Sequence, residues 1–189
     1  MNQTETIQAN DRAAACIERL SSLAEESKLT GYFHVECLGP DGQIKWTETF
    51  QNQVTTVGAN FMLDKTFAGS SYTAAWYLGL VTGPGASNTY LAANTMASHA
   101  GWTESTAYSN ATRPVMAFSA ASGAAISTSA AVSFNINNTA TIAGAFVTTD
   151  NTKGGTTGTL YSVKNFTGGD RAVASGDILN VSYTTTITV

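Results

Sequence analysis

The sequence predicts a mainly β protein, an antiparallel β-sandwich of jelly-roll or Ig-like style with an amphipathic helix at its N-terminus. Three observations lead to this class. Thr, Ser, Ala and Gly dominate from about Thr66 onward, apolar and polar residues alternate from Tyr32, and turn signals separate about eight short segments. Thr suits a pleated, half-buried surface and Gly supplies the bends, so this composition favours short strands joined by turns. The strand order does not follow from these patterns.

Residues 10–28 are expected to form the amphipathic helix. Asn10 or Asp11 can cap its start, and the apolar residues recur three and four positions apart, on one face. They are Ala13, Cys16, Ile17, Leu20, Leu23 and Ala24. The helix either packs on its own body or docks as an arm on a neighbouring subunit, since a narrow apolar stripe at a terminus is easily exchanged. Residues 1–29 are therefore predicted to be a helical arm and residues 30–189 the β-sandwich body.

The first part of the body is expected to contain a hairpin, a short helix and a buried strand. Alternating apolar residues at 32–37 and 44–47 flank the turn signal GPDG at 39–42, which is typical of a β-hairpin. The spacing of Val54, Val57 and Phe61 fits a helix better than alternation, so a short helix is predicted near 54–66, weakened by Gly58 and its Thr residues. The apolar run at 76–81 predicts a buried strand.

Residues 84–111 are expected to form a long irregular connection that contains Met96, His99, Trp102 and Tyr108. A loop of that length in a compact domain is usually functional or forms an interface. Turn signals divide the rest of the chain into further predicted strands at 113–119, 126–136, 140–149, 157–163 and 178–189.

The charge pattern argues against several classes of function. Only 12% of the 189 residues are charged, with 9 Lys+Arg, 13 Asp+Glu and a net charge of -4, and no Lys/Arg cluster suits nucleic acid. No apolar run approaches the roughly 18 to 20 residues that span a bilayer, and the acidic balance of the N-terminal helix excludes a basic membrane-surface helix. The N-terminus lacks the features of a secretory signal, so we expect a soluble protein made in a cytoplasm.

Neither a disulfide, a metal site nor a cofactor site is expected. Cys16 and Cys37 fall in different predicted elements, without CxxC spacing or a neighbouring histidine pair. Asp150, Asn151 and Thr152 could offer oxygen ligands, but they lack the spaced Asp/Asn series and the terminal Glu of a calcium loop. The Gly-Gly pairs at 154–155 and 168–169 lie between strands rather than between a strand and a helix, so no phosphate cradle is predicted.

The titratable residues do not form a recognisable active site. His34 is expected at the surface of a strand, and a Ser-His-acid set built on His99 and Glu104 lacks a nucleophile-elbow motif. Paired carboxylates for glycoside hydrolysis could come from Glu104, Asp150, Asp170 and Asp177. Asp170 and Asp177, however, follow glycines at turn positions, so a structural role is predicted for both. We therefore predict no catalytic residue.

Aromatic residues around the long connection are the remaining candidates for a contact surface. Aromatic side chains supply large contact areas at low entropic cost, which suits either core packing or a subunit interface. Both interpretations are open for this set, which comprises Tyr72, Trp76, Tyr77, Tyr90, Trp102 and Tyr108.

Several strings in one order resemble a group of virion proteins of tailed bacteriophages. They are NQVTTVGANFMLD at 52–64, AWYLGL at 75–80, TMASHAGWTE at 95–104, RP at 113–114, GTLYS at 158–162, GDR at 169–171 and GD at 176–177. The resemblance covers residues 30–189 and implies a noncatalytic virion protein, foremost a capsid cement or decoration protein that stabilises the head shell. The implied partners are the major capsid protein and copies of the chain itself, in a homo-oligomer on the capsid surface. Unpaired thiols agree with assembly in a reducing host cytoplasm.

Two other classes of function stay open. One is an adhesin on the tail or head that binds host surface glycans through Trp102, Tyr108 and nearby acids, and the other is a glycan-cleaving enzyme. Many copies on assembled heads would favour cement, and few copies at the tail tip would favour the adhesin. As contact residues of a cement protein we predict Leu20 and Leu23, on the apolar face of the arm, and Trp102 and Tyr108, as aromatic anchors.

Overall fold

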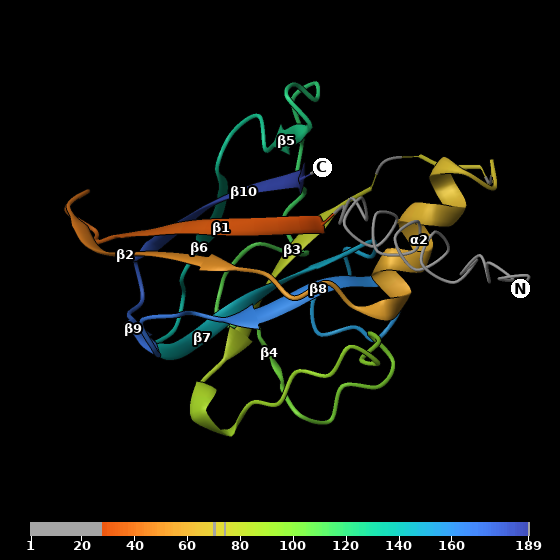
Figure 1. Cartoon of the computed structure of the whole chain (residues 1–189). Coiled ribbons are helices and arrows are strands. Elements are labelled where there is room, and N and C mark those ends of the chain that lie inside the picture. Colours follow the sequence, from red (N-terminus) through yellow and green to blue (C-terminus); the bar gives the residue numbers. More distant parts are fainter. Residues whose placement is uncertain (1–27, 70, 74, 189) are drawn as a thin grey trace, which may run out of the picture.

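The computed structural model describes residues 28–69, 71–73 and 75–188 (Figure 1). These residues form two antiparallel β-sheets and one α-helix, which confirms the predicted mainly β class. The helix predicted at 10–28, with Leu20 and Leu23, lies outside the described residues except for Lys28, which begins the first strand.

The first sheet has the order β2-β1-β10, and two short strands pair one after the other with the remaining edge of β10. β1 (Lys28–Leu38) and β2 (Ile44–Gln51) form the predicted hairpin, and Gly42 in its turn has a φ of 76°, which favours glycine. β1 pairs along its whole length with β10 (Ile178–Thr188). β5 (Ala125–Ser127) and β6 (Val132–Asn135) pair with different parts of β10.

The second sheet has the order β4-β3-β7-β8, and its longest strand is β7 (Ala140–Thr148). One edge of β7 pairs with β3 (Tyr77–Thr82), which in turn pairs with β4 (Glu104–Ser105). The other edge pairs with β8 (Leu160–Asn165) and β9 (Arg171–Val173). A short 3-10 helix, η1 (Gly85–Ser87), follows β3.

Both sheets contribute side chains to one core. Alternate residues of β1 and β10 point inward, and they meet the apolar residues of β3 and β7 in a single cluster. Phe33 of β1 stacks on Phe50 of β2 with ring centroids 4.9 Å apart, and it also contacts Tyr183 of β10. Burial of apolar surface is the main force that stabilises such a body.

Several predicted strand boundaries are wrong. The strand expected at 113–119 is irregular, with isolated bridges at Val115 and Phe118, because Pro114 cannot donate to a ladder and Arg113 turns inward. The strand expected at 126–136 is interrupted between β5 and β6. β8 starts at Leu160 rather than at 157, after a turn in which Gly158 has a φ of 86°. β4 and β9 are too short to give an alternating pattern.

The predicted short helix is confirmed as α2 (Thr56–Thr66), which lies at one end of the two sheets (Figure 1). The hydroxyl oxygen of Thr55 accepts a hydrogen bond of 3.0 Å from the backbone N–H of Gly58 and so caps the start of α2. Gly58 lies directly against the backbone of Tyr161 in β8, where an added Cβ would stand 2.5 Å from the carbonyl oxygen. The helix therefore contacts β8 backbone to backbone.

Candidate functional site

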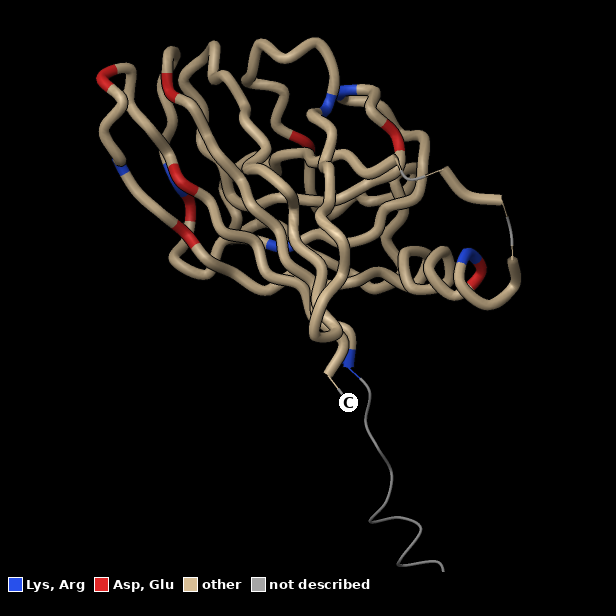
Figure 2. The backbone as a smooth tube through the Cα atoms, turned by 90° about the horizontal axis from the view of Figure 1, so that it is seen from above, with Lys and Arg blue, Asp and Glu red and all other residues tan. Residues whose placement is uncertain are grey.

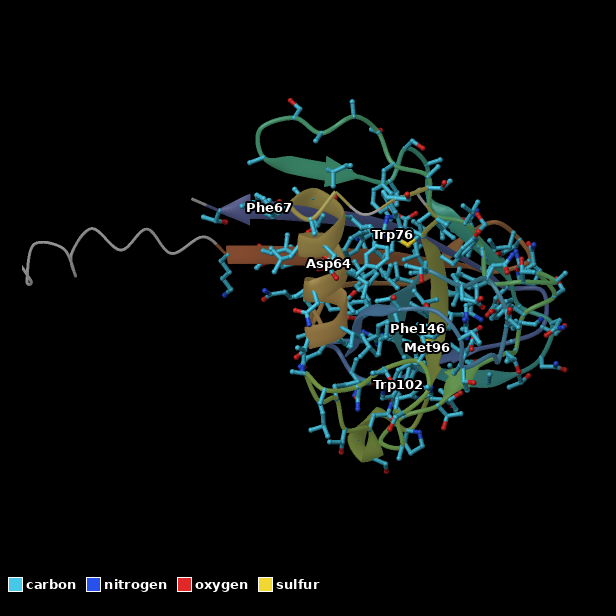
Figure 3. All side chains as sticks on the ribbon, turned by 90° about the vertical axis from the view of Figure 1, so that its right-hand side faces the viewer. Asp64, Phe67, Trp76, Met96, Trp102 and Phe146 are labelled. Atoms are coloured by element: carbon cyan, nitrogen blue, oxygen red, sulfur yellow. The ribbon has the colours of Figure 1, made fainter. Side chains whose placement is uncertain are left out.

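The long connection packs on the second sheet and is not free in solvent. Met96 and Trp102 from this connection lie against Phe146 of β7, as the labelled side chains in Figure 3 show, and they form a second apolar cluster with Val81, Leu160 and Val163. Trp102 is 4% exposed. His99 stacks on that ring at a centroid distance of 4.1 Å. This packing covers the outer face of the sheet, so the chain from 84 to 103 acts as a further layer.

Tyr108 is fully buried. Its ring meets Phe134 edge to face at 5.0 Å, and its hydroxyl donates a hydrogen bond of 3.4 Å to Glu104 Oε1. Burial, together with the charge of Glu104, raises the pKa of Tyr108 well above its ordinary value. Of the two interpretations left open for Trp102 and Tyr108, core packing is therefore the arrangement found within the chain.

Glu104 and Arg113 form a buried ion pair beneath Tyr108. Arg113 Nε donates to Glu104 Oε1 at 3.0 Å, and Arg113 Nη2 donates to Glu104 Oε2 at 2.7 Å. The guanidinium also donates to the backbone carbonyls of Asp150 and Gly155. The backbone N–H of Gly154 donates to Glu104 Oε2 at 2.9 Å. The pair therefore ties the connection around Glu104 to the loop that joins β7 and β8.

The same loop is held by Lys153. Its ammonium lies 4.6 Å from the centre of the Tyr108 ring and donates to the backbone carbonyls of Tyr108 and Asn110 at 3.0 and 2.8 Å. Hydrogen bonds from the backbone N–H and side chain of Thr152 lower the pKa of Asp150. Both charged groups stabilise loop geometry, since their partners are neighbouring backbone groups.

Asp177 is a further buried acid. Its Oδ2 accepts hydrogen bonds from Lys45 Nζ at 2.6 Å and from the backbone N–H of Ala174 at 2.9 Å, and the thiol of Cys37 lies 3.8 Å away. Burial alone would raise the pKa of Asp177, but these hydrogen bonds outweigh it and lower the pKa. Asp177 thus joins the turn before β10 to the hairpin, in agreement with its predicted structural role.

The remaining candidates are spread over the surface. His34 is exposed on β1 and contacts Thr49 and Glu36, as expected for a surface histidine. Asp170 accepts a hydrogen bond of 2.8 Å from the backbone N–H of Gly85. It lines a small hollow of about 320 Å³ together with Asn165 and Phe166. Among the described residues, no group of three or more His, Cys, Asp or Glu side chains could hold a metal ion.

A second hollow, with a mainly apolar lining, lies beside α2, and we call it the α2 groove. It has a volume of about 290 Å³ and is lined mainly by Phe61, Met62, Lys65, Trp76, Ile126 and Thr185. Phe61 and Trp76 contact each other edge to face at 5.5 Å.

No helix within the described ranges is long and apolar enough to cross a membrane.

Sequence reasoning missed Arg113 as the centre of a network. The available signal was an arginine next to a proline in a chain with few charges, nine residues after a glutamate in the long connection.

Comparison of the chain with known protein families, curated proteins and solved structures found no match.

Proposed function

We propose that the chain is a noncatalytic structural protein of a tailed-bacteriophage virion, acting as a capsid cement or decoration protein. The resemblance of its motifs to phage virion proteins suggests this class. The observation that carries the proposal is the buried Glu104–Arg113 pair, in which the acid that follows His99 in the sequence fastens a long connection onto the body. A carboxylate held by two hydrogen bonds from a buried arginine fixes the two loops relative to each other and so supports the rigidity that a shell component needs.

The charge distribution supports the same proposal. Charged residues of the described body are few and spread among uncharged ones (Figure 2), and three buried acids each contact a cation: Glu48 with Arg171, Glu104 with Arg113, and Asp177 with Lys45. Many of the exposed residues of the described body are Thr, Ser and Ala, and a surface with few charges and small side chains suits flat contacts with a protein shell. The proposed partners are the major capsid protein and further copies of the chain. The body is then a β-sandwich of jelly-roll or Ig-like style.

Binding to heads tests the proposal. The purified chain is added to heads that lack it, and the bound copies and the temperature of DNA release are measured. Many bound copies and a higher release temperature are expected, because a protein that binds only the assembled shell stabilises that state. Heads that already carry the chain are the matched control, since their sites are filled. Absence of binding to the bare heads would refute the cement proposal.

The adhesin is the second candidate, and one observation favours it. The hollow beside η1 is lined by the amide of Asn165 and the carboxylate of Asp170, which are hydrogen-bonding groups that sugars contact. The expected sign is a small number of copies at the tail and binding to glycans of the host surface. An Asp170→Asn variant should then weaken glycan binding while its amide oxygen still accepts the hydrogen bond from Gly85. Cleavage of the glycan, abolished by Glu104→Gln, would instead indicate the enzyme.

A further inference from the structure

Exposed apolar side chains lie around the α2 groove. Beside it, Phe67 at the end of α2 is 82% exposed, and Leu63, Tyr72 and Ile187 are each about half exposed. Figure 3 shows Phe67 at the end of α2 and Trp76 beside the helix, on the side of the sheets. Contiguous apolar surface next to a hollow is typical of an interaction site.

The strand register places the start of β1 at this end of the body. Lys28 is paired with Thr188, and Thr185 in the groove is three residues earlier on β10. At about 3.3 Å per residue, the two positions are separated by about 10 Å along the strand. The first 27 residues of the chain are therefore attached close to the groove, at the end where β1 begins and β10 ends (Figure 1).

We propose that residues 10–24 of the same chain, joined to β1 by residues 25–27, dock in the α2 groove and insert Leu20 and Leu23 between α2 and the end of β10. The apolar stripe predicted for this segment matches the apolar lining of the groove. If helical, residues 13–24 would be about 18 Å long, close to the about 16 Å of the 11-residue helix α2. The segment and the wall of the groove thus have similar lengths.

Charge supports the same occupant. Residues 1–27 contain five acidic and two basic residues, which gives a net charge of -3. The groove is lined by one cation, Lys65, whose ammonium lies 5.3 Å from the centre of the Phe61 ring. Glu18, Glu25 or Glu26 could approach this ammonium while the leucines enter the groove.

The same chain is a better source for the segment than a second copy. Residues 25–27 can reach about 10 Å when extended, which equals the separation of Lys28 from Thr185 along the strands. A tether this short gives an effective concentration in the millimolar range, well above that of a separate molecule in dilute solution. This inference does not depend on the proposed phage function.

Engineered disulfides test the docking and its source. In a Cys16→Ala background, Leu20→Cys or Leu23→Cys is combined with Ile126→Cys or Thr66→Cys, both at the groove. The matched control combines the same substitutions with Ile44→Cys, at the hairpin turn on the opposite end of the body (Figure 1). We expect rapid disulfide formation within single chains for at least one groove pair, since a disulfide needs Cα atoms about 4.4–6.8 Å apart, and none for the control.

Disulfides between two chains would overturn the proposal by assigning the groove to a neighbouring copy. Bonding no faster than in the Ile44→Cys control would overturn it as well.

Hydrogen exchange of the intact chain gives a second readout. Leu20→Asp combined with Leu23→Asp should make the amides of residues 61–66 and 184–187 exchange several-fold faster than in the parent. Ser22→Asp, on the opposite side of the predicted helix, is the control and should leave these amides unchanged. Equal protection in all three proteins would overturn the proposal. Protection that disappears when a co-purified small molecule is removed would also overturn it and identify a different occupant.

Discussion

Arg113 holds Glu104 through two parallel hydrogen bonds in the interior, where the arginine side chain is fully buried and the glutamate side chain nearly so. The guanidinium of Arg113 also lies 5.2 Å from the centre of the Phe146 ring, and the indole ring of Trp102 packs against this same ring. The ion pair and the second apolar cluster thus share a neighbour. Loss of the pair should loosen both the long connection and the loop that joins β7 and β8.

Replacement of Arg113 by methionine should destabilise the protein strongly. It leaves the Glu104 carboxylate buried without its cation, and breaking a buried pair in this way costs about 3–5 kcal/mol. Urea denaturation followed by tryptophan fluorescence measures the change. In the Glu104→Leu/Arg113→Met double variant part of the loss should be recovered, because no charge is left buried, although backbone groups of Asp150, Gly154 and Gly155 lose their partners. A loss below about 1 kcal/mol in the single variant would show that the pair is not energetically important.

Asp177 should make stability depend on pH in the acidic range. Its pKa in the folded protein is lower than the unfolded value of about 3.9, so the carboxylate stabilises the fold at higher pH, and this contribution is lost as pH falls through the folded pKa. The free energy of unfolding is measured between pH 3 and pH 7. The free energy of unfolding of the Asp177→Asn variant should be furthest below that of the parent above about pH 5. The difference between the two proteins should shrink as the pH falls.

The Lys45→Met variant is a sharper test of the same interaction. Without the ammonium, burial becomes the dominant influence on Asp177 and should raise its pKa relative to the parent. The variant should therefore lose less stability than the parent on acidification. An identical pH dependence in the parent and both variants would contradict the assigned role of the pair.

Regular elements could be predicted where the chain has a clear period. The helix α2 and the strands β7 and β10 lie close to their predicted bounds. The hairpin was predicted in the right place, but β1 starts four residues before the predicted segment 32–37 and β2 ends four residues after the predicted segment 44–47. Short strands such as β4 and β9 depend on tertiary pairing and carry no such signal.

The interior position of Trp102 and Tyr108 could not be decided from sequence. The sequence pattern around an aromatic residue in a loop is the same whether the loop projects into solvent or folds back onto a sheet. Here Phe146 points away from the core shared by the two sheets, and Gly79 leaves space for its ring, so the loop can cover that face. Likewise, the sequence shows that Glu104 and Arg113 carry opposite charges, but their contact depends on how the chain folds and could not be predicted from the sequence.

Cys37 should resist alkylation in the folded protein. Burial, followed in importance by the nearby charge of Asp177, raises the pKa of the Cys37 thiol to about 11, so little thiolate exists at pH 8. Iodoacetamide labelling at pH 8, mapped by mass spectrometry of peptides, should leave Cys37 unmodified in buffer and modify it in concentrated urea. Rapid labelling in buffer would show that β1 and the turn before β10 open frequently.

Gly58→Ala should destabilise the protein although alanine favours helices. Alanine is better than glycine in a helix by about 0.8–1.0 kcal/mol. At this position, however, the added methyl group would stand 2.5 Å from the carbonyl oxygen of Tyr161, and backbone cannot move aside as a flexible side chain can. Overpacking costs about 1–3 kcal/mol, so we expect a net loss, measured by urea denaturation. Asn60→Ala, at an exposed site of the same helix, is the control and should stabilise by a few tenths of a kcal/mol. If both alanines stabilise equally, α2 does not press against β8 as described.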